Sequence, residues 1–305
     1  MTERESSWEK LPTEARHPET AELDRLPTAR IVELLVEEDR RGLEQVRAAA
    51  ATIARVADGM AATFAAGGDV LFAGAGTSGR LGVLEAAECP PTFGTAPERI
   101  RAAMAGGAAA VFAAAEGAED SEADGRKAAS ELGRGDLLVA ISASSVTPFA
   151  RGALAAARER GARTVLLTCA APAGLEGAAD ELIALDTGAE ILTGSTRLKA
   201  GSATKAALNA LTTAAMVRAG KVYGNWMVDL RPGSRKLEDR ALRIVAGAAG
   251  IGRDEAAALL ESAGGEAKTA IVMARAGVAA DEARRLLAAL GGDVRLAIAR
   301  AGSPC

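Results

Sequence analysis

The chain changes from a helical to a strand-like pattern of apolar positions near residue 69. Residues 28–68 place apolar side chains at three- and four-residue steps, which is the period of an amphipathic helix, and a Gly-Gly pair ends the stretch. Short apolar runs follow, separated by amphipathic stretches. The runs are 69–74, 99–106, 136–142, 163–169 and 181–187. This alternation predicts an α/β fold in which helices cover both faces of a parallel sheet.

Helical segments flank the predicted sheet on both sides. We expect an N-terminal helical segment over residues 1–60, the α/β domain over 61–234 and a helical domain over 235–305. Within residues 254–298, glycines at 264–265, 277 and 291–292 are expected to break the chain into three short helices. A helical appendix of this size is typical of small interaction modules.

Charge and hydropathy exclude several classes of protein. With 36 basic and 40 acidic residues the net charge is −4, so no basic field favours nucleic acid and no Lys/Arg tract marks a membrane surface. No apolar stretch approaches the roughly 20 residues of a membrane helix. The charged N-terminus lacks the apolar core of a signal peptide. We therefore expect a soluble cytoplasmic protein.

Cysteine and histidine usage limits the possible chemistry. Cys89, Cys169 and Cys305 are far apart, so neither a zinc knuckle nor a disulfide framework is indicated. His17, in a polar N-terminal segment, is the only histidine, and we interpret it as a surface residue. A multi-histidine metal site is impossible. Carboxylates are therefore the expected proton carriers if the protein is an enzyme.

Two hydroxyl-rich loops follow predicted strands. The first, "GAGTSGR" (74–80), offers backbone N–H groups and a helix N-terminus to an anion. It formally matches G-x-G-x-x-G, but no acidic residue closes the next strand to hold a ribose. The second is "SASSVTP" (142–148). Two such loops suit the phosphate of a small sugar better than a dinucleotide, although ordinary capping turns are the alternative. The candidate ligand donors are Gly76, Thr77, Ser78, Gly79, Ser142, Ser144 and Thr147.

A third polar stretch, "TGSTRLKAGSATK" (193–205), precedes a long apolar helix. Ser195 and Thr196 are candidate donors to a sugar or phosphate, and Lys199 or Lys205 could reach an anion. The alternative, equally weighted, is that the hydroxyls cap the helix and the lysines are solvated. Further along, Tyr223 and Trp226 could form a platform for a sugar, but core packing is the favoured interpretation.

These stretches, in this order, resemble the sugar isomerase (SIS) domain, and within that superfamily the N-acetylmuramic acid 6-phosphate etherases. The resemblance covers nearly the whole chain and is carried by residues 23–40, 74–95, 114–121, 191–205 and 220–230. It implies a three-layer αβα sandwich with a five-stranded parallel sheet and a small UBA-like C-terminal domain. It also implies a sugar-phosphate substrate, no metal or organic cofactor, and a homodimer with the active site near the subunit interface.

The resemblance further implies two catalytic glutamates, Glu88 in "ECPPTFG" and Glu119 in "EGAEDS". We expect Pro90 and Pro91 to end the preceding helix around Glu88, where the negative end of the helix dipole would favour a protonated acid. Glu119 would lie just before the next helix, where the positive end would favour an ionised base. Without the resemblance, both would be interpreted as solvated helix-end residues. Glu85 is interpreted as a helix-face residue.

Three departures from the family pattern stand out. Ser145 and Val146 replace the usual Gly-Arg of the second loop, "CAAPAG" (169–174) replaces a Cys-Asn-Pro-type segment, and His17 replaces an asparagine. The first change favours one alternative function, a non-catalytic sugar-phosphate sensor like the related glucokinase regulatory protein. An aldose–ketose isomerase of the same fold is the other alternative.

Overall fold

The computed structural model describes residues 11–170, 177–230 and 235–302. The chain forms two compact units, and each is considered by itself. The first contains the residues up to Ala86 together with Glu98–Thr212, and the second contains Ala87–Pro97 together with the chain from Thr213 onward.

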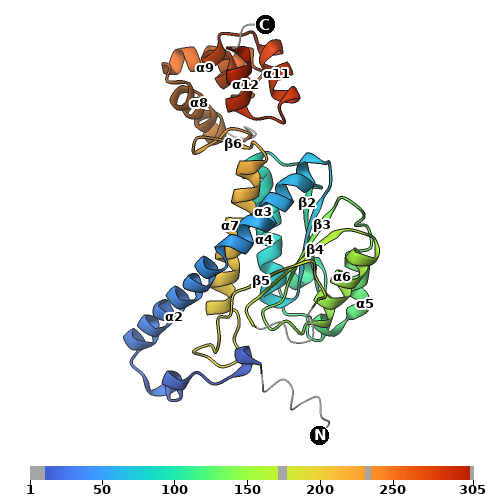
Figure 1. Ribbon diagram of the computed structural model, residues 1–305. Helices are drawn as coiled ribbons and strands as arrows, with labels where there is room; N and C mark the ends of the chain where they lie inside the picture. Colours follow the sequence, from blue (N-terminus) through green and yellow to red (C-terminus); the bar gives the residue numbers. More distant parts are fainter. Residues whose placement is uncertain (1–10, 171–176, 231–234, 303–305) are drawn as a thin grey trace. The chain divides into compact units, whose positions relative to one another are not determined.

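A five-stranded, wholly parallel sheet is the centre of the first unit, with the strand order β2-β1-β3-β4-β5 (Figure 1). The α/β prediction is thus confirmed, and each of the five apolar runs contains one strand. The strands are β1 (Val70–Gly74), β2 (Ile100–Met104), β3 (Leu137–Ile141), β4 (Arg163–Thr168) and β5 (Glu181–Ala184). Every residue of β1 and β3 is buried, which explains why these runs are continuously apolar instead of alternating.

Helices cover both faces of this sheet. Figure 1 shows α5 and α6 on one side and α3 and α4 on the other. On the α5–α6 side, Phe149 and Leu154 pack with Leu71, Leu138 and Leu166 of the strands. The helices assigned wholly or partly to this unit are α2 (Thr28–Ala48), α3 (Ala50–Ala65), α4 (Gly76–Phe93), α5 (Glu122–Ala128), α6 (Pro148–Glu159) and α7 (Lys199–Arg218).

The segment before α2 consists of short 3-10 turns, η1 (Pro12–Glu14), η2 (Pro18–Thr20) and η3 (Leu23–Arg25). His17 lies here, and its expected surface position is wrong: only 7% of the residue is exposed. Its Nδ1 accepts a hydrogen bond of 3.2 Å from the Glu19 N–H, and its Nε2 lies 3.5 Å from Glu38 of α2. A buried carboxylate on another element, which the local sequence does not reveal, draws the imidazole inward.

The second unit contains a hairpin and a helical cluster. The hairpin pairs β6 (Val222–Tyr223) with β7 (Trp226–Met227). The cluster consists of α8 (Arg235–Ala249), α9 (Arg253–Ser262), α10 (Ala267–Ala276), α11 (Ala280–Ala289) and α12 (Val294–Ala301). Its core includes Ile244, Ile271, Leu287 and Val294. The expected glycine breaks are present, but in the part of the chain that is described they separate four helices, α9 to α12, instead of three.

Helix α4 ends later than the sequence suggests. Pro90 and Pro91 lie inside it, and the helix runs to Phe93. Gly94 caps the C-terminus of the helix. Its φ of +62° is left-handed, and its N–H donates to the Pro90 carbonyl at 2.9 Å. The expected stop at Glu88 is therefore wrong, because the φ that proline imposes is compatible with a last helical turn. Glu88 lies before that turn and loses the dipole effect assigned to it.

Candidate active site

The loops singled out in the sequence gather at the carboxyl edge of the sheet. Because β1 and β3 are parallel neighbours, the loops that follow them leave the sheet at the same edge. Helix α4 begins at Gly76, two residues beyond the end of β1, and α6 begins at Pro148 after the loop that follows β3. Both loops therefore lead into helix N-termini, whose free N–H groups favour an anion.

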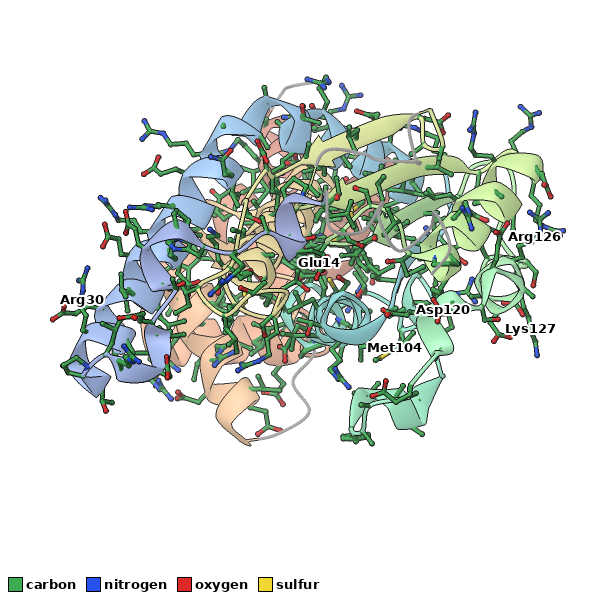
Figure 2. The ribbon with its side chains drawn as sticks, turned by 90° about the horizontal axis from the view of Figure 1, so that it is seen from below. Glu14, Arg30, Met104, Asp120, Arg126 and Lys127 are labelled. Atoms are coloured by element: carbon green, nitrogen blue, oxygen red, sulfur yellow. The ribbon has the colours of Figure 1, made fainter. Side chains whose placement is uncertain are left out.

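Two cavities at this edge share one carboxylate. A cavity of about 180 Å³ is lined by Gly76, Arg80 and Glu116 among others, and Glu119 forms part of its wall. A larger cavity of about 390 Å³ is also lined by Glu119. Its other lining residues are Leu11, Glu14, Asp120, Ser144, Val146, Thr147 and Pro148. Figure 2 shows Glu14, Asp120 and Met104 in the view from below. Glu119 is thus the carboxylate common to both cavities.

Local structure holds Glu119 at this position. It lies in the turn η5 (Ala118–Asp120), which follows Gly117 in the left-handed region at φ +70°. Ser121 then caps α5 by accepting the Asp124 N–H at 3.2 Å. The expectation that Glu119 directly precedes a helix is confirmed, and the positive end of α5 is close to its backbone. The residue is exposed in the single chain.

Arg80 fixes the segment that leads to Glu119. Its Nε donates to the Val111 carbonyl and its Nη2 to the Ala110 carbonyl, both at 2.9 Å, and Nη2 also lies 3.5 Å from the Ala113 carbonyl. One guanidinium therefore holds the turn η4 (Ala108–Val111) against the N-terminal part of α4. Sequence reasoning missed this role, although the arginine closes the "GAGTSGR" motif.

Some hydroxyl groups of the loop after β3 are buried and support the loop, whereas others line the larger cavity. Ser142 is buried, and its hydroxyl is 2.8 Å from that of Thr147, so it supports Thr147 and does not itself reach the cavity. Ser144 and Thr147 line the larger cavity. Ser145 is buried in the left-handed region at φ +64°, and its hydroxyl bonds Thr168. This conformation explains why a glycine suits the position.

The first turn of α7 lies close to the first turn of α4, which carries part of the glycine-rich loop. A Cβ built on Gly201 would be 3.6 Å from the Thr77 methyl group and 3.4 Å from the Thr196 carbonyl. Gly79 packs tightly on the end of β1, since a Cβ there would meet the Gly74 carbonyl at 2.6 Å. The start of α7 therefore lies near the first hydroxyl-bearing loop, whereas Ser195 and Thr196 are not among the residues that line the two cavities.

Comparison with known proteins identifies the family. A model of the glucokinase regulatory protein N-terminal SIS domain matches residues 34–158. The N-acetylmuramic acid 6-phosphate etherase of Parasynechococcus marenigrum (strain WH8102) is 49% identical over 86% of this chain and 84% of its own. The etherase of Gloeobacter violaceus is 47% identical over 90% of both chains. The chain belongs to the N-acetylmuramic acid 6-phosphate etherase family. The etherase of Rubrobacter xylanophilus, 48% identical over 86% of this chain, agrees.

Membership in the etherase family does not make Lys199 a substrate ligand here. The residue is 4% exposed, and its Nζ bonds Glu38 and the Ala189 carbonyl. Burial alone would raise the pKa of Glu38. The bond to Lys199 and the charges of Lys199, Arg41 and His17 outweigh it and hold the pKa below its ordinary 4.5. The expected anion-binding role of Lys199 is therefore replaced by a structural ion pair.

Glu88, the other glutamate that the etherase resemblance singles out, belongs to the second unit and is exposed. It is not among the residues that line the two cavities. Glu85 is buried instead, where Lys205 Nζ lies 3.1 Å away and Thr212 donates to it. Lys205 is thus engaged by a carboxylate and does not face either cavity.

The sequence also singles out Trp226 and the "CAAPAG" segment. Trp226 contacts Gly247, where a Cβ would be 2.8 Å from the indole ring, but 38% of the tryptophan is exposed, so its expected place in the core is wrong. Tyr223 is half-buried against the core of the helical cluster. The part of "CAAPAG" beyond Ala170 lies outside the described residues. Among the residues that the structure does describe, no group of three or more His, Cys, Asp or Glu side chains could hold a metal, and no helix could cross a membrane.

Proposed function

We propose that the protein is a cofactor-free carbon–oxygen lyase that acts on N-acetylmuramic acid 6-phosphate in the cytoplasm. Its products are D-lactate and N-acetylglucosamine 6-phosphate, which serve cell-wall amino-sugar recycling. The observation that carries this proposal is Glu119 in the wall shared by two cavities, beside the hydroxyls of Ser144 and Thr147. The family membership supplies the substrate class.

Elimination is the chemistry that two carboxyl groups can perform on such an ether. In the ring-opened sugar, the C1 aldehyde acidifies the proton on C2. A base removes that proton, lactate leaves from C3 with a proton from an acid, and water then adds to the resulting enal. The reaction needs one ionised and one protonated group near neutral pH.

We assign the base to Glu119 and the acid to Glu88. The position of Glu119 just before α5, in the wall of both cavities, supports its assignment as the base. For Glu88 the assignment depends on the family resemblance alone, because α4 continues to Phe93. The phosphate binds on the side of the N-termini of α4 and α6, with Gly76–Gly79, Ser144 and Thr147 as donors.

A homodimer completes this site. Both glutamates are exposed in the single chain, whereas a closed active site removes its reacting groups from water. A partner subunit that covers the carboxyl edge would supply that burial. Mixing Glu88→Ala and Glu119→Ala chains tests whether one site takes its glutamates from two subunits. Recovery of about a quarter of the wild-type activity is expected in that case, and no recovery if each subunit supplies both.

The decisive experiment measures D-lactate release from N-acetylmuramic acid 6-phosphate in the presence of EDTA. Wild type should release lactate, whereas Glu88→Ala and Glu119→Ala should not, and Glu98→Ala, an exposed acid that lines neither cavity, serves as the matched control. Absence of lactate from folded wild type would overturn the lyase. Binding without turnover would then indicate the sensor. An isomerase would release no lactate from wild type, and its exchange of the C2 proton would survive Glu88→Ala, because it needs no acid at C3.

A further inference from the structure

Glu14 contributes a carboxylate to the larger cavity, and the reaction described above gives it no role. It ends the turn η1 and lines the cavity together with Glu119, Ser144 and Thr147. Figure 2 shows Glu14 and Asp120, which border this cavity, in the view from below. The N-terminal segment therefore adds a polar group to a site built otherwise from loops of the sheet.

The backbone that carries Glu14 is anchored. Leu11, Thr13, His17 and Thr20 are all buried, whereas Glu14 between them is exposed. The Thr20 hydroxyl donates to the Ile191 carbonyl at 2.9 Å, which ties the segment to the chain just before α7. Because the backbone is already fixed, only the side chain of Glu14 has to be ordered when it binds a ligand.

The carboxylate of Glu14 has no partner of its own within residues 11–170, 177–230 and 235–302. None of the hydrogen bonds or ion pairs among these residues involves it. Its Oε2 lies 3.0 Å from the position that a Cβ on Gly194 would occupy, so it covers the turn that carries Ser195 and Thr196. Glu14 thus lies between two hydroxyl-bearing segments, with its acceptor oxygens available to a donor in the cavity.

We propose that Glu14 contacts the substrate and accepts a hydrogen bond from a hydroxyl or the acetamido N–H of the sugar. The inference rests on the proposed function, because it concerns the same cavity and the same sugar phosphate. A carboxylate repels a phosphate and attracts neutral donors. Both groups are satisfied when the phosphate lies on the side of the α4 and α6 N-termini and the sugar lies against Glu14. Glu14 thereby selects the sugar, while the helix termini select the phosphate.

Product binding tests this role without turnover. Calorimetric titration with N-acetylglucosamine 6-phosphate compares wild type with Glu14→Gln and Glu14→Ala. Glu19→Gln is the matched control, since Glu19 is an exposed acid in the same segment and does not line the cavity. Loss of a hydrogen bond to a charged group is expected to weaken binding about 10- to 100-fold in the two Glu14 variants. Affinity for inorganic phosphate should not fall, and kcat/KM for lactate release should decrease in parallel with product affinity.

The sign of the effect separates a contact from a general charge effect. Removing a negative charge near an anionic ligand would by itself tighten binding. Product affinity in Glu14→Gln that is equal to or tighter than wild type would therefore overturn the role of Glu14. An equal loss of affinity for inorganic phosphate would overturn it as well. Lactate release by wild type in the same preparation distinguishes these failures from failure of the proposed lyase.

Discussion

The buried ion pair between Lys199 and Glu38 should affect stability and not substrate binding. In Lys199→Met the side chain keeps its apolar stem, but Glu38 loses a partner while only about 4% exposed. Removing one member of a buried pair costs about 3–5 kcal/mol. Arg41, which remains 2.7 Å from the other Glu38 oxygen, compensates part of the charge. We therefore expect a loss near the lower end of that range, about 3 kcal/mol at pH 7.

The loss of stability in Lys199→Met should become smaller as the pH falls. The pKa of Glu38 is lowered in the folded protein, so its pairing stabilises the fold above the ordinary value of 4.5. That stability disappears as the pH falls through the lowered folded pKa. A protonated Glu38 needs no cation. The difference between Lys199→Met and wild type should therefore shrink steadily below pH 4.5, and Glu38→Gln combined with Lys199→Met should recover part of the stability at pH 7.

Chemical denaturation between pH 3.5 and 7.5 measures these differences. The first unit comprises about 200 residues. For a unit of this size, a loss of 3 kcal/mol in the free energy of unfolding corresponds to a fall in Tm of roughly 6–12 °C, which thermal unfolding measures. A loss in the free energy of unfolding of Lys199→Met below about 1 kcal/mol at pH 7 would refute the reasoning. So would a loss that is just as large at low pH as at pH 7. An increase in KM without a change in Tm would instead restore Lys199 as a substrate ligand.

Three further substitutions probe the site and the second unit. Arg80→Met should lower kcat/KM for lactate release about tenfold, because it frees the segment that positions Glu119; Arg80→Lys should recover part of the loss. Gly94→Ala should cost roughly 2–4 kcal/mol in urea denaturation, because the new Cβ would meet a backbone carbonyl at 2.1 Å. The same change at Gly67, also left-handed but without neighbours within 4 Å, isolates the conformational part. Val146→Arg should tighten inorganic phosphate binding about tenfold in calorimetry, because it places a cation in the larger cavity.

Strand positions and the glycine-rich loops could be predicted from the sequence because local rules decide them. Val70–Gly74 is an apolar run bounded by Asp69 and the glycine-rich loop, and its burial on both faces leaves no alternation to misinterpret. Gly76 and Gly79 serve different needs in one motif. Gly76 adopts φ +53°, and Gly79 allows close contact between helix and strand. Both needs are encoded within a few residues.

Expectations failed where the deciding partner is distant in sequence. His17 is expected at the surface, and Lys199 either at an anion or in solvent, yet both side chains are buried against Glu38 of α2. The separation between Lys199 and Glu38 is 161 residues, which no local pattern records. Glu14 escaped notice for the same reason, since all the residues that line the cavity with it, apart from Leu11, are more than 100 residues away in the sequence. Pairs of residues this far apart in the chain cannot be predicted from local patterns in a single sequence.

The anchoring of the N-terminal segment has a consequence for synthesis. The bond from Thr20 to Ile191 spans 171 residues, so the segment that presents Glu14 leaves the ribosome long before its docking surface exists. At about 5–20 residues per second, that delay is roughly ten to thirty seconds. The sheet can pair in the meantime, because its strands emerge in order. The N-terminal segment is thus the first described part of the chain to be translated but among the last to dock. The larger cavity acquires the wall that contains Glu14 only at that point.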